Sequence, residues 1–256
     1  MRTGGGMSRV SRPAAGAREE HPLVASPGRD IAVTVVFLVL TAFVFAAVAD
    51  PGALAHIQRI DDSWLRLNVA NRSAPVTVIA KFFNLLGLVS VTLPVRIAIA
   101  GYLALRRRWW HFAAFVGAIV LSEALIGTLK GIYDRARPPG SLVATSGASF
   151  PSGHSIAASV TIVAAVIALV PPGRRRAWWG AGAVAFSVLM AASRAYLGAH
   201  WLSDAIAGVL LGTSCALLAA LVAGALQRRW GRRQPGGPVP PAGQSAPGTT
   251  EPVDRR

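Results

Sequence analysis

Charged residues are scarce in this chain of 256 residues, and acidic ones are the scarcest, with 11 Asp and Glu against 26 Lys and Arg. Only 14% of the residues are charged and 53% are hydrophobic, which leaves too little polar surface for a soluble domain of this length. The single cysteine, Cys215, excludes an intrachain disulfide and is expected to pack as a small apolar residue. The sequence contains no internal repeat and no sign of a second folded domain.

Long apolar runs are what the sequence does contain. A run must cover about 30 Å to cross the hydrocarbon core of a bilayer. Six runs reach this length, the fourth and fifth only with the help of flanking residues: 31–49, 76–105, 110–129, 155–170, 177–193 and 203–226. The sequence therefore predicts an all-α fold, a bundle of six transmembrane helices over residues 31–227.

The net charge of +15 is concentrated in arginine clusters beside these runs. Clusters at 106–108, 174–176 and 228–233 lie on one side of a six-span chain, together with five arginines in the first 30 residues. By the positive-inside rule, this side and both termini are cytoplasmic in a multi-pass protein of the cell membrane. We expect these arginines to set the topology and to contact anionic lipid, and we expect no nucleic-acid partner.

The segments outside the spans have distinct compositions. Residues 1–30 predict a disordered cytoplasmic N-terminus, and residues 228–256 predict a basic, then Pro/Gly-rich, disordered tail to which the sequence assigns no function. In segment 54–71 an apolar helical stripe opposes a charged one that includes Arg59, Asp61 and Asp62. This pattern predicts an amphipathic helix in the outer interface, which either borders the entry of a lipid or simply covers the bundle.

Three short segments, all predicted to lie at the outer face, hold most of the reactive side chains. They read K-x6-RP from Lys130 to Arg137 and Pro138, PSGH over residues 151–154, and R-x5-H-x3-D from Arg194 through His200 to Asp204. Each segment contributes cations or an imidazole, and no Asp/Glu/His cluster with metal-ligand spacing accompanies them. Such a set is suited to phosphoryl transfer without a metal, so no cofactor is expected.

Each motif residue has an expected role in that chemistry. Lys130, Arg137 and Arg194 would hold the phosphate oxygens. Ser152 would add a hydroxyl donor, and Gly153 would let the backbone approach the anion at a helix N-terminus. His200 and Asp204 are four residues apart, so the carboxylate can hold one ring nitrogen and leave the other free to attack phosphorus.

Three further charged residues have weaker assignments. Arg135 lies beside the motif cations, and we expect it to be solvated or to face lipid headgroups. Arg96 and Glu123 fall at membrane depth, where polar groups are costly. Either the two side chains pair inside the bundle, or Arg96 extends to the inner headgroups.

The ordered triple of motifs resembles the type 2 phosphatidic acid phosphatase superfamily, which includes undecaprenyl-diphosphatase-like and phosphatidylglycerol-phosphate phosphatase-like enzymes. The resemblance extends from about residue 57 to residue 226 and departs at no motif position. It implies an integral membrane lipid phosphatase in which His200 forms a phosphohistidine and His154 protonates the leaving oxygen. The motif spacing alone would equally allow direct attack by water.

Other functions and several substrates stay open at this stage. A phosphotransferase would pass the group to an alcohol, and a lipid-binding scaffold would keep the bundle without the chemistry. The six spans exclude a soluble vanadate-dependent haloperoxidase. Undecaprenyl diphosphate, phosphatidic acid and phosphatidylglycerol phosphate all fit the motifs, and the sequence does not define the oligomeric state.

Overall fold

The computed structural model describes residues 21–233, and these residues form eight helices and no strand. The all-α prediction is therefore confirmed over this range. The predicted disordered ends lie largely outside it, at residues 1–20 and 234–256. The helices are α1 (Pro27–Ala49), α2 (Pro51–Ala70), α3 (Ala74–Leu86), α4 (Val89–Leu105), α5 (Trp109–Tyr133), α6 (Gly153–Leu169), α7 (Arg174–Tyr196) and α8 (Leu202–Arg233).

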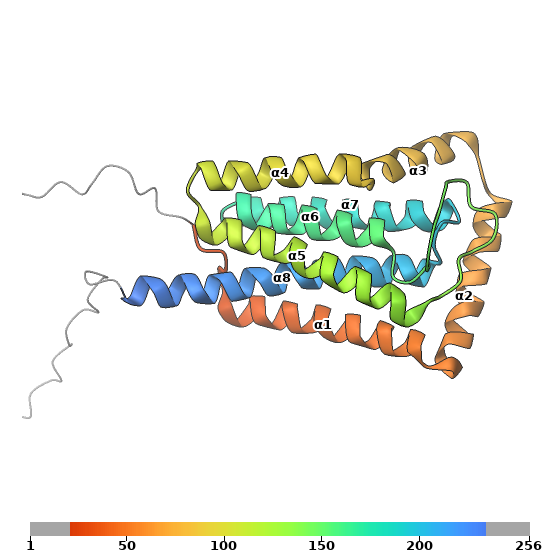
Figure 1. The fold of residues 1–256 in the computed structure, drawn as a ribbon, viewed down its shortest axis with the longest axis horizontal. Helices are drawn as coiled ribbons and strands as arrows, with labels where there is room; N and C mark the ends of the chain where they lie inside the picture. The colour runs from red at the N-terminus through yellow and green to blue at the C-terminus, as the bar shows by residue number, and fades with distance from the viewer. Residues whose placement is uncertain (1–20, 234–256) are drawn as a thin grey trace, which may run out of the picture.

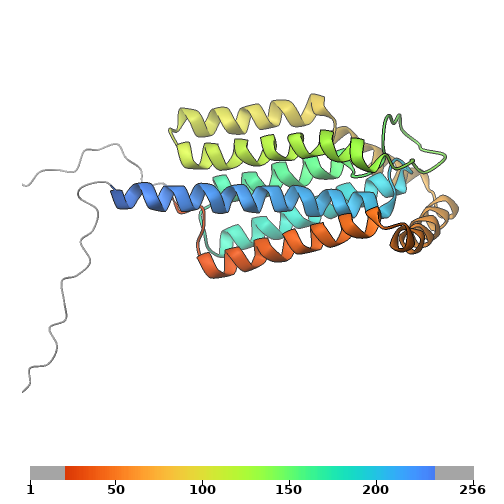
Figure 2. The same cartoon turned by 60° about the horizontal axis from the view of Figure 1, so that its bottom comes forward.

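Most of these helices run lengthwise in one bundle, and α2 crosses one end of it (Figure 1). The loop of residues 134–152, between α5 and α6, lies at the same end as α2. The described N-terminal segment and the end of α8 lie at the opposite end, as the turned view also shows (Figure 2). The two ends of the bundle therefore differ, and all three motifs fall at or near the end that carries α2.

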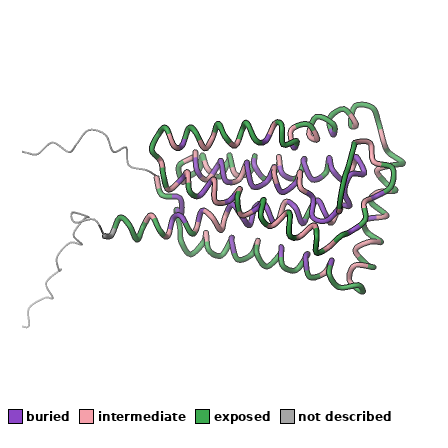
Figure 3. Tube along the Cα trace, viewed as in Figure 1, coloured by how far each residue is buried: buried purple, intermediate pink, exposed green. Residues whose placement is uncertain are grey.

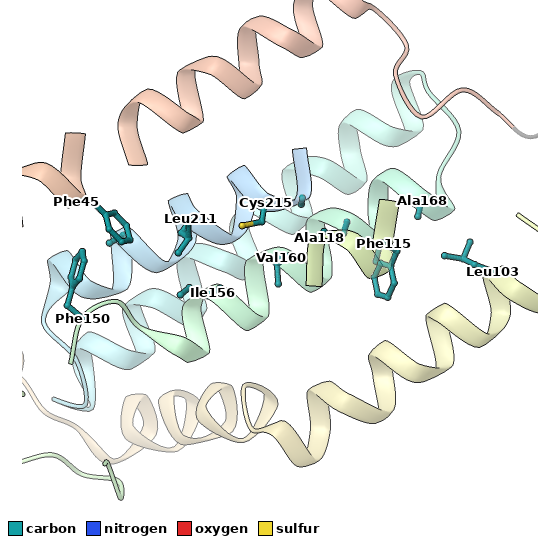
Figure 4. Packing of buried hydrophobic residues seen from close by; sticks show 14 of the residues in the cluster. Phe45, Leu103, Phe115, Ala118, Phe150, Ile156, Val160, Ala168, Leu211 and Cys215 are labelled. Atoms are coloured by element: carbon teal, nitrogen blue, oxygen red, sulfur yellow. The ribbon is translucent and has the colours of Figure 1, made fainter. Parts of the chain in front are cut away.

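Helix α6 is at the centre of the bundle. Ten of its 17 residues are buried, and it packs against α8, α7 and α5. Figure 3 shows the buried residues gathered on the inner helices, and Figure 4 shows the apolar core formed by residues such as Phe115, Val160 and Leu211. Cys215 is buried in this core, as its apolar assignment predicts.

The outer helices expose large apolar side chains, as expected for a surface that faces lipid. Phe43 on α1 is 69% exposed and Leu105 on α4 is 86% exposed. Among the described helices, α1, α5 and α8 are each long and apolar enough to span a membrane, as is the bent α3–α4 pair. The chain is thus a multi-pass membrane protein. Helix α6, with 17 residues, is shorter, and the count of six crossings stays a prediction.

The second apolar run is not one continuous helix. The sequence predicts a single span over residues 76–105, but the chain breaks at Gly87 and Leu88, and α3 and α4 meet at 51°. Leu88 is extended and precedes α4, while the Gly87 amide closes α3 on the carbonyls of Phe83 and Asn84. The prediction fails because a glycine disfavours helix at the point where α6 comes close.

Two further assignments are settled by packing. Residues 21–30, assigned from composition to a disordered N-terminus, are ordered: Leu23 and Val24 are buried in a cluster with Ala223 of α8, and α1 begins at Pro27. Arg96 pairs with Glu123 across α4 and α5, with Nη1 2.7 Å from Oε1. Of the two alternatives for Arg96, pairing with Glu123 is the one observed, but the pair lies at the side of the bundle, since the Glu123 side chain is 52% exposed.

Candidate active site

Six of the eight predicted site residues line one cavity of about 340 Å³, where α5 ends and α6 begins. No carboxylate is among the residues that line it. The lining consists of Lys130, Arg137, Ala144, Thr145, Ser146, Gly153, His154, Arg194 and His200. The two remaining predicted residues, Ser152 and Asp204, are fully buried nearby. Three segments that are separate in the sequence thus meet at a cavity whose charge favours an anion.

His200 lies in the loop between α7 and α8, with one ring nitrogen fixed as a donor. Its Nδ1 is 2.7 Å from the carbonyl oxygen of Ser149. A carbonyl oxygen can only accept, so Nδ1 carries the hydrogen and Nε2 of the neutral ring is an unprotonated acceptor. Arg137 Nη1 lies 3.3 Å from Nε2, which fits this assignment.

Burial also keeps this imidazole neutral. Desolvation lowers the pKa of His200 to about 4, the nearby charges of Arg194 and Arg137 act in the same direction, and Asp204 opposes them. At neutral pH the Nε2 lone pair is therefore available for attack on an electrophile in the cavity.

Asp204 lies close to His200 but mainly bonds other groups. Its Oδ2 is 3.8 Å from His200 Nδ1, while it accepts from the Trp201 amide at 2.9 Å and from the Ser149 hydroxyl. The i,i+4 argument assumed one helix, but α8 begins at Leu202, so His200 precedes it. Asp204 therefore contacts His200 chiefly through Ser149, which sequence reasoning missed.

The three cations are held by neutral groups. Arg137 donates to the carbonyls of Gly147 and Ala199 at 2.9 and 2.7 Å, and burial lowers its pKa. Lys130 Nζ donates to the Ala148 carbonyl at 3.0 Å. Backbone carbonyls of the loop of residues 144–149 thus bind the basic side chains. Because these carbonyls are neutral, the contacts do not neutralise the charge of the cations.

Arg194 reaches the cavity from α7 and is almost fully buried. Its Nη1 donates to Asn84 Oδ1 of α3, and its Nε has no hydrogen-bond partner among the described residues. Asn84 gave no signal in the sequence, since it is a single amide within an apolar run. It nevertheless orients the third cation from the helix that ends at Gly87.

The PSGH segment forms the start of α6. Ser152 is fully buried and caps the helix, accepting from the Ser155 amide at 3.5 Å and from the Ser155 hydroxyl at 3.0 Å. The Ser152 oxygen thus acts as a helix cap, a role that small polar residues at this position commonly fulfil. The oxygen accepts both bonds, so its predicted role as a phosphate donor stays a prediction. Gly153 lines the cavity at the helix N-terminus, as expected for an anion site.

His154 faces the cavity and packs against the break between α3 and α4. Its Nε2 is buried without a hydrogen-bond partner in the described part of the chain. A Cβ placed on Gly87 would overlap its ring. The absence of a side chain at Gly87 therefore makes room for His154, which periodicity within one run could not have revealed.

Two expectations are wrong: that Arg135 is solvated or faces headgroups, and that Asp61 lies on a charged stripe opposite the apolar one. Both side chains are buried, and Arg135 Nη2 is 2.8 Å from Asp61 Oδ2. Asp61 lies four residues after Ile57 and three before Trp64, which places it on the apolar stripe of α2. A charge on that stripe was the signal that could have predicted a buried partner.

Within residues 21–233 there is no group of three or more His, Cys, Asp or Glu that could hold a metal ion. The side chains present include a neutral imidazole with an unprotonated nitrogen, three cations that can bind an anion, and a second imidazole able to exchange a proton. These are the groups that a phosphoryl transfer with a covalent intermediate requires.

Comparison with known proteins agrees with this chemistry. Residues 111–228 match the PAP2 superfamily. Phosphatidylglycerophosphatase B of Bacillus subtilis is 28% identical over 61% of this chain and 79% of its own length. Lipid A 1-phosphatase of Rhizobium johnstonii is 35% identical, over 44% of this chain and 48% of its own length.

The fold also has a match among solved structures. The crystal structure of a transmembrane PAP2-type phosphatidylglycerolphosphate phosphatase from Bacillus subtilis superposes with a TM-score of 0.65. The two chains are 25% identical, and the match covers 78% of this chain and 98% of the other.

Proposed function

We propose that this chain, whose residues 111–228 match the PAP2 superfamily, is a membrane lipid phosphatase of that type and removes a phosphate from a lipid phosphate or diphosphate through a phosphohistidine on His200. The observation that carries the proposal is the state of His200. Its Nδ1 hydrogen is committed to the Ser149 carbonyl, and its ring belongs to the lining of a cavity with three cations and no carboxylate.

The first step transfers the phosphoryl group to the enzyme. His200 Nε2 attacks phosphorus while Lys130, Arg137 and Arg194 stabilise the charge on the equatorial oxygens. The bond to the lipid oxygen breaks, and His154 donates a proton to that oxygen. The negative charge of the bound phosphate favours the protonated form of His154.

In the second step water hydrolyses the phosphohistidine. His154, now neutral, accepts a proton from the attacking water, and the phosphorus–nitrogen bond breaks to return His200 and release inorganic phosphate. Apart from the substrate and water, every group in this cycle is a side chain of this protein, so we propose that turnover does not depend on a metal ion.

The two named relatives indicate the substrates to test first. One acts on a phosphatidylglycerol phosphate and the other on the 1-phosphate of lipid A, judging by their names. We propose a lipid phosphate with an accessible terminal phosphate, phosphatidylglycerol phosphate foremost. Phosphatidic acid and undecaprenyl diphosphate share that chemical feature and belong in the same panel.

The test is phosphate release by the purified protein in detergent, with this panel of lipids and with chelator present. His200→Ala should lower turnover by several orders of magnitude, because no covalent bond can form. His56→Ala is the matched control, since His56 is exposed on α2, and it should retain wild-type turnover. Near-normal turnover by a folded His200→Ala protein would refute the covalent mechanism. Activity that disappears in chelator and returns with Mg²⁺ would refute metal independence.

A further inference from the structure

Arg135 bridges two buried carboxylates beside the proposed active site. Its Nη1 is 2.6 Å from Asp204 Oδ1, and its Nη2 is 2.8 Å from Asp61 Oδ2. The Arg135 side chain is 7% exposed, and the side chains of Asp204 and Asp61 are 0% and 1% exposed. The guanidinium also lies 5.6 Å from the ring of Trp201, the residue after His200. Its two terminal nitrogens thus tie the interfacial helix α2 to the first turn of α8.

The network continues from Arg135 to the proposed nucleophile through Ser149. The Ser149 amide donates to the Arg135 carbonyl at 2.7 Å, and its hydroxyl donates to Asp204 Oδ2. The Ser149 carbonyl accepts from His200 Nδ1 at 2.7 Å. Ser149 is therefore held at two points, by the main-chain carbonyl of Arg135 and by the Asp204 side chain, and its third group selects the tautomer of His200.

The second carboxylate fixes the helix that carries Asp204. Asp61 Oδ1 accepts from the Ser203 amide at 2.9 Å and Oδ2 from the Ser203 hydroxyl at 2.5 Å. A negative charge at a helix N-terminus is favourable, and here it is supplied from another helix. Two buried carboxylates then share one guanidinium, so the loss of that cation would leave both without their bridge.

We infer that the Arg135 side chain is a positioning group that holds Asp204, and through Asp204 the Ser149 hydroxyl, so that His200 keeps Nδ1 protonated and Nε2 free for attack. This role rests on the proposed function of His200. Arginine suits it because two separate nitrogens reach two carboxylates at once, whereas the ammonium of lysine is a compact point charge. Arg135 does not line the cavity, so its substitution removes none of the groups that line it.

The experiment compares Arg135→Gln, Arg135→Lys, Asp61→Asn and the double variant Arg135→Gln/Asp61→Asn. Arg59→Gln is the matched control, because Arg59 is exposed on α2 near Asp61. Each protein is assayed for kcat, KM and thermal stability in detergent with phosphatidylglycerol phosphate. Arg135→Gln should lower kcat by about 10²-fold, the order expected when a reacting group is misplaced, with little change in KM. Arg135→Lys should recover part of that loss.

The double variant separates positioning from simple stabilisation. Asp61→Asn removes one of the uncompensated charges, so the double variant should regain thermal stability relative to Arg135→Gln. The kcat of the double variant should stay low, because Asp204 still lacks the guanidinium of Arg135 as its partner. If kcat recovered together with thermal stability in the double variant, the inference would be overturned. It would also be overturned if Arg135→Gln changed KM and left kcat unchanged.

A spectroscopic measurement tests the network without turnover. In protein labelled with ¹⁵N-histidine, the wild-type His200 ring should show a protonated Nδ1 and an unprotonated Nε2 at neutral pH. Arg135→Gln should mix the tautomers, and Arg59→Gln should not. An unchanged His200 spectrum in Arg135→Gln would overturn the inference. If the wild-type protein releases no phosphate from any lipid, the proposed function fails, and this spectrum still decides whether Arg135 controls His200.

Discussion

At the scale of single residues, the site depends on one missing side chain as well as on the charged ones. Gly87 ends α3, and the ring of His154 occupies the space where a Cβ would lie. Because Gly87 has an ordinary right-handed backbone conformation, its role is steric and does not concern backbone strain. The position of the proposed acid is thus set by a residue 67 positions away in the sequence.

We predict that Gly87→Ala lowers kcat by about 10²-fold, because His154 must shift away from its place in the cavity. Gly101→Ala on α4 is the matched control, since no atom lies within 4 Å of the added Cβ. Phosphate release by the two purified variants measures the difference. Equal activity of both would show that His154 accommodates the methyl group.

At the scale of elements, the contact between α6 and α8 determines where the PSGH segment lies. Gly208, Gly212, Ala216 and Ala220 recur every four residues on α8 and let the two backbones approach closely. A Cβ on Gly208 would lie 2.7 Å from the Ser152 carbonyl oxygen. Small residues on α8 therefore bring the start of α6, and with it His154, against the helix that carries Asp204.

We predict that Gly212→Ala destabilises the protein by about 1–3 kcal/mol, the usual cost of overpacking. The added Cβ would overlap Ser159 Oγ and lie 2.7 Å from the Ile156 carbonyl oxygen, which is backbone and cannot rotate away. Gly117→Ala on α5 has open space and serves as the control. Thermal unfolding in detergent measures the effect, and equal melting temperatures would contradict this account of the α6–α8 contact.

At the scale of the whole molecule, the two ends of the bundle have different chemistry. The motifs meet at the end that α2 crosses, and the arginine clusters lie at the other end, residues 106–108 between α4 and α5 and residues 174–176 in the first turn of α7 (Figure 1). Positive loops stay in the cytoplasm during membrane insertion. We therefore propose that the catalytic end faces outward, where it would act on lipids of the outer leaflet.

Cysteine labelling tests this orientation in intact cells. In a Cys215→Ala background, Asn71→Cys lies in the exposed turn between α2 and α3, and Pro171→Cys lies in the exposed loop between α6 and α7. A membrane-impermeant thiol reagent should label position 71 from outside and position 171 only after the membrane is opened. Labelling in the reverse order would place the proposed active site in the cytoplasm.

The sequence by itself determined the helical class, the membrane setting and the residues of the cavity. Apolar runs of sufficient length have few alternatives to helices in a bilayer, because every backbone polar group must be bonded internally. The motif spacing was specific enough to group Lys130, Arg137, His154, Arg194 and His200, which line one cavity. The length of an apolar run and the spacing of a motif are local properties of the chain, so they can be read from the sequence without the fold.

Only the tertiary structure decided which groups hold those residues in place. Ser149, Asp61 and Arg135 form their bonds across distances of up to 142 residues, and periodicity within a segment contains no information on such partners. The close approach of His154 to Gly87 is likewise a contact between different helices, which spacing within one run does not contain. A buried charge must find a partner wherever the fold provides one, and that choice is made by packing rather than by sequence spacing.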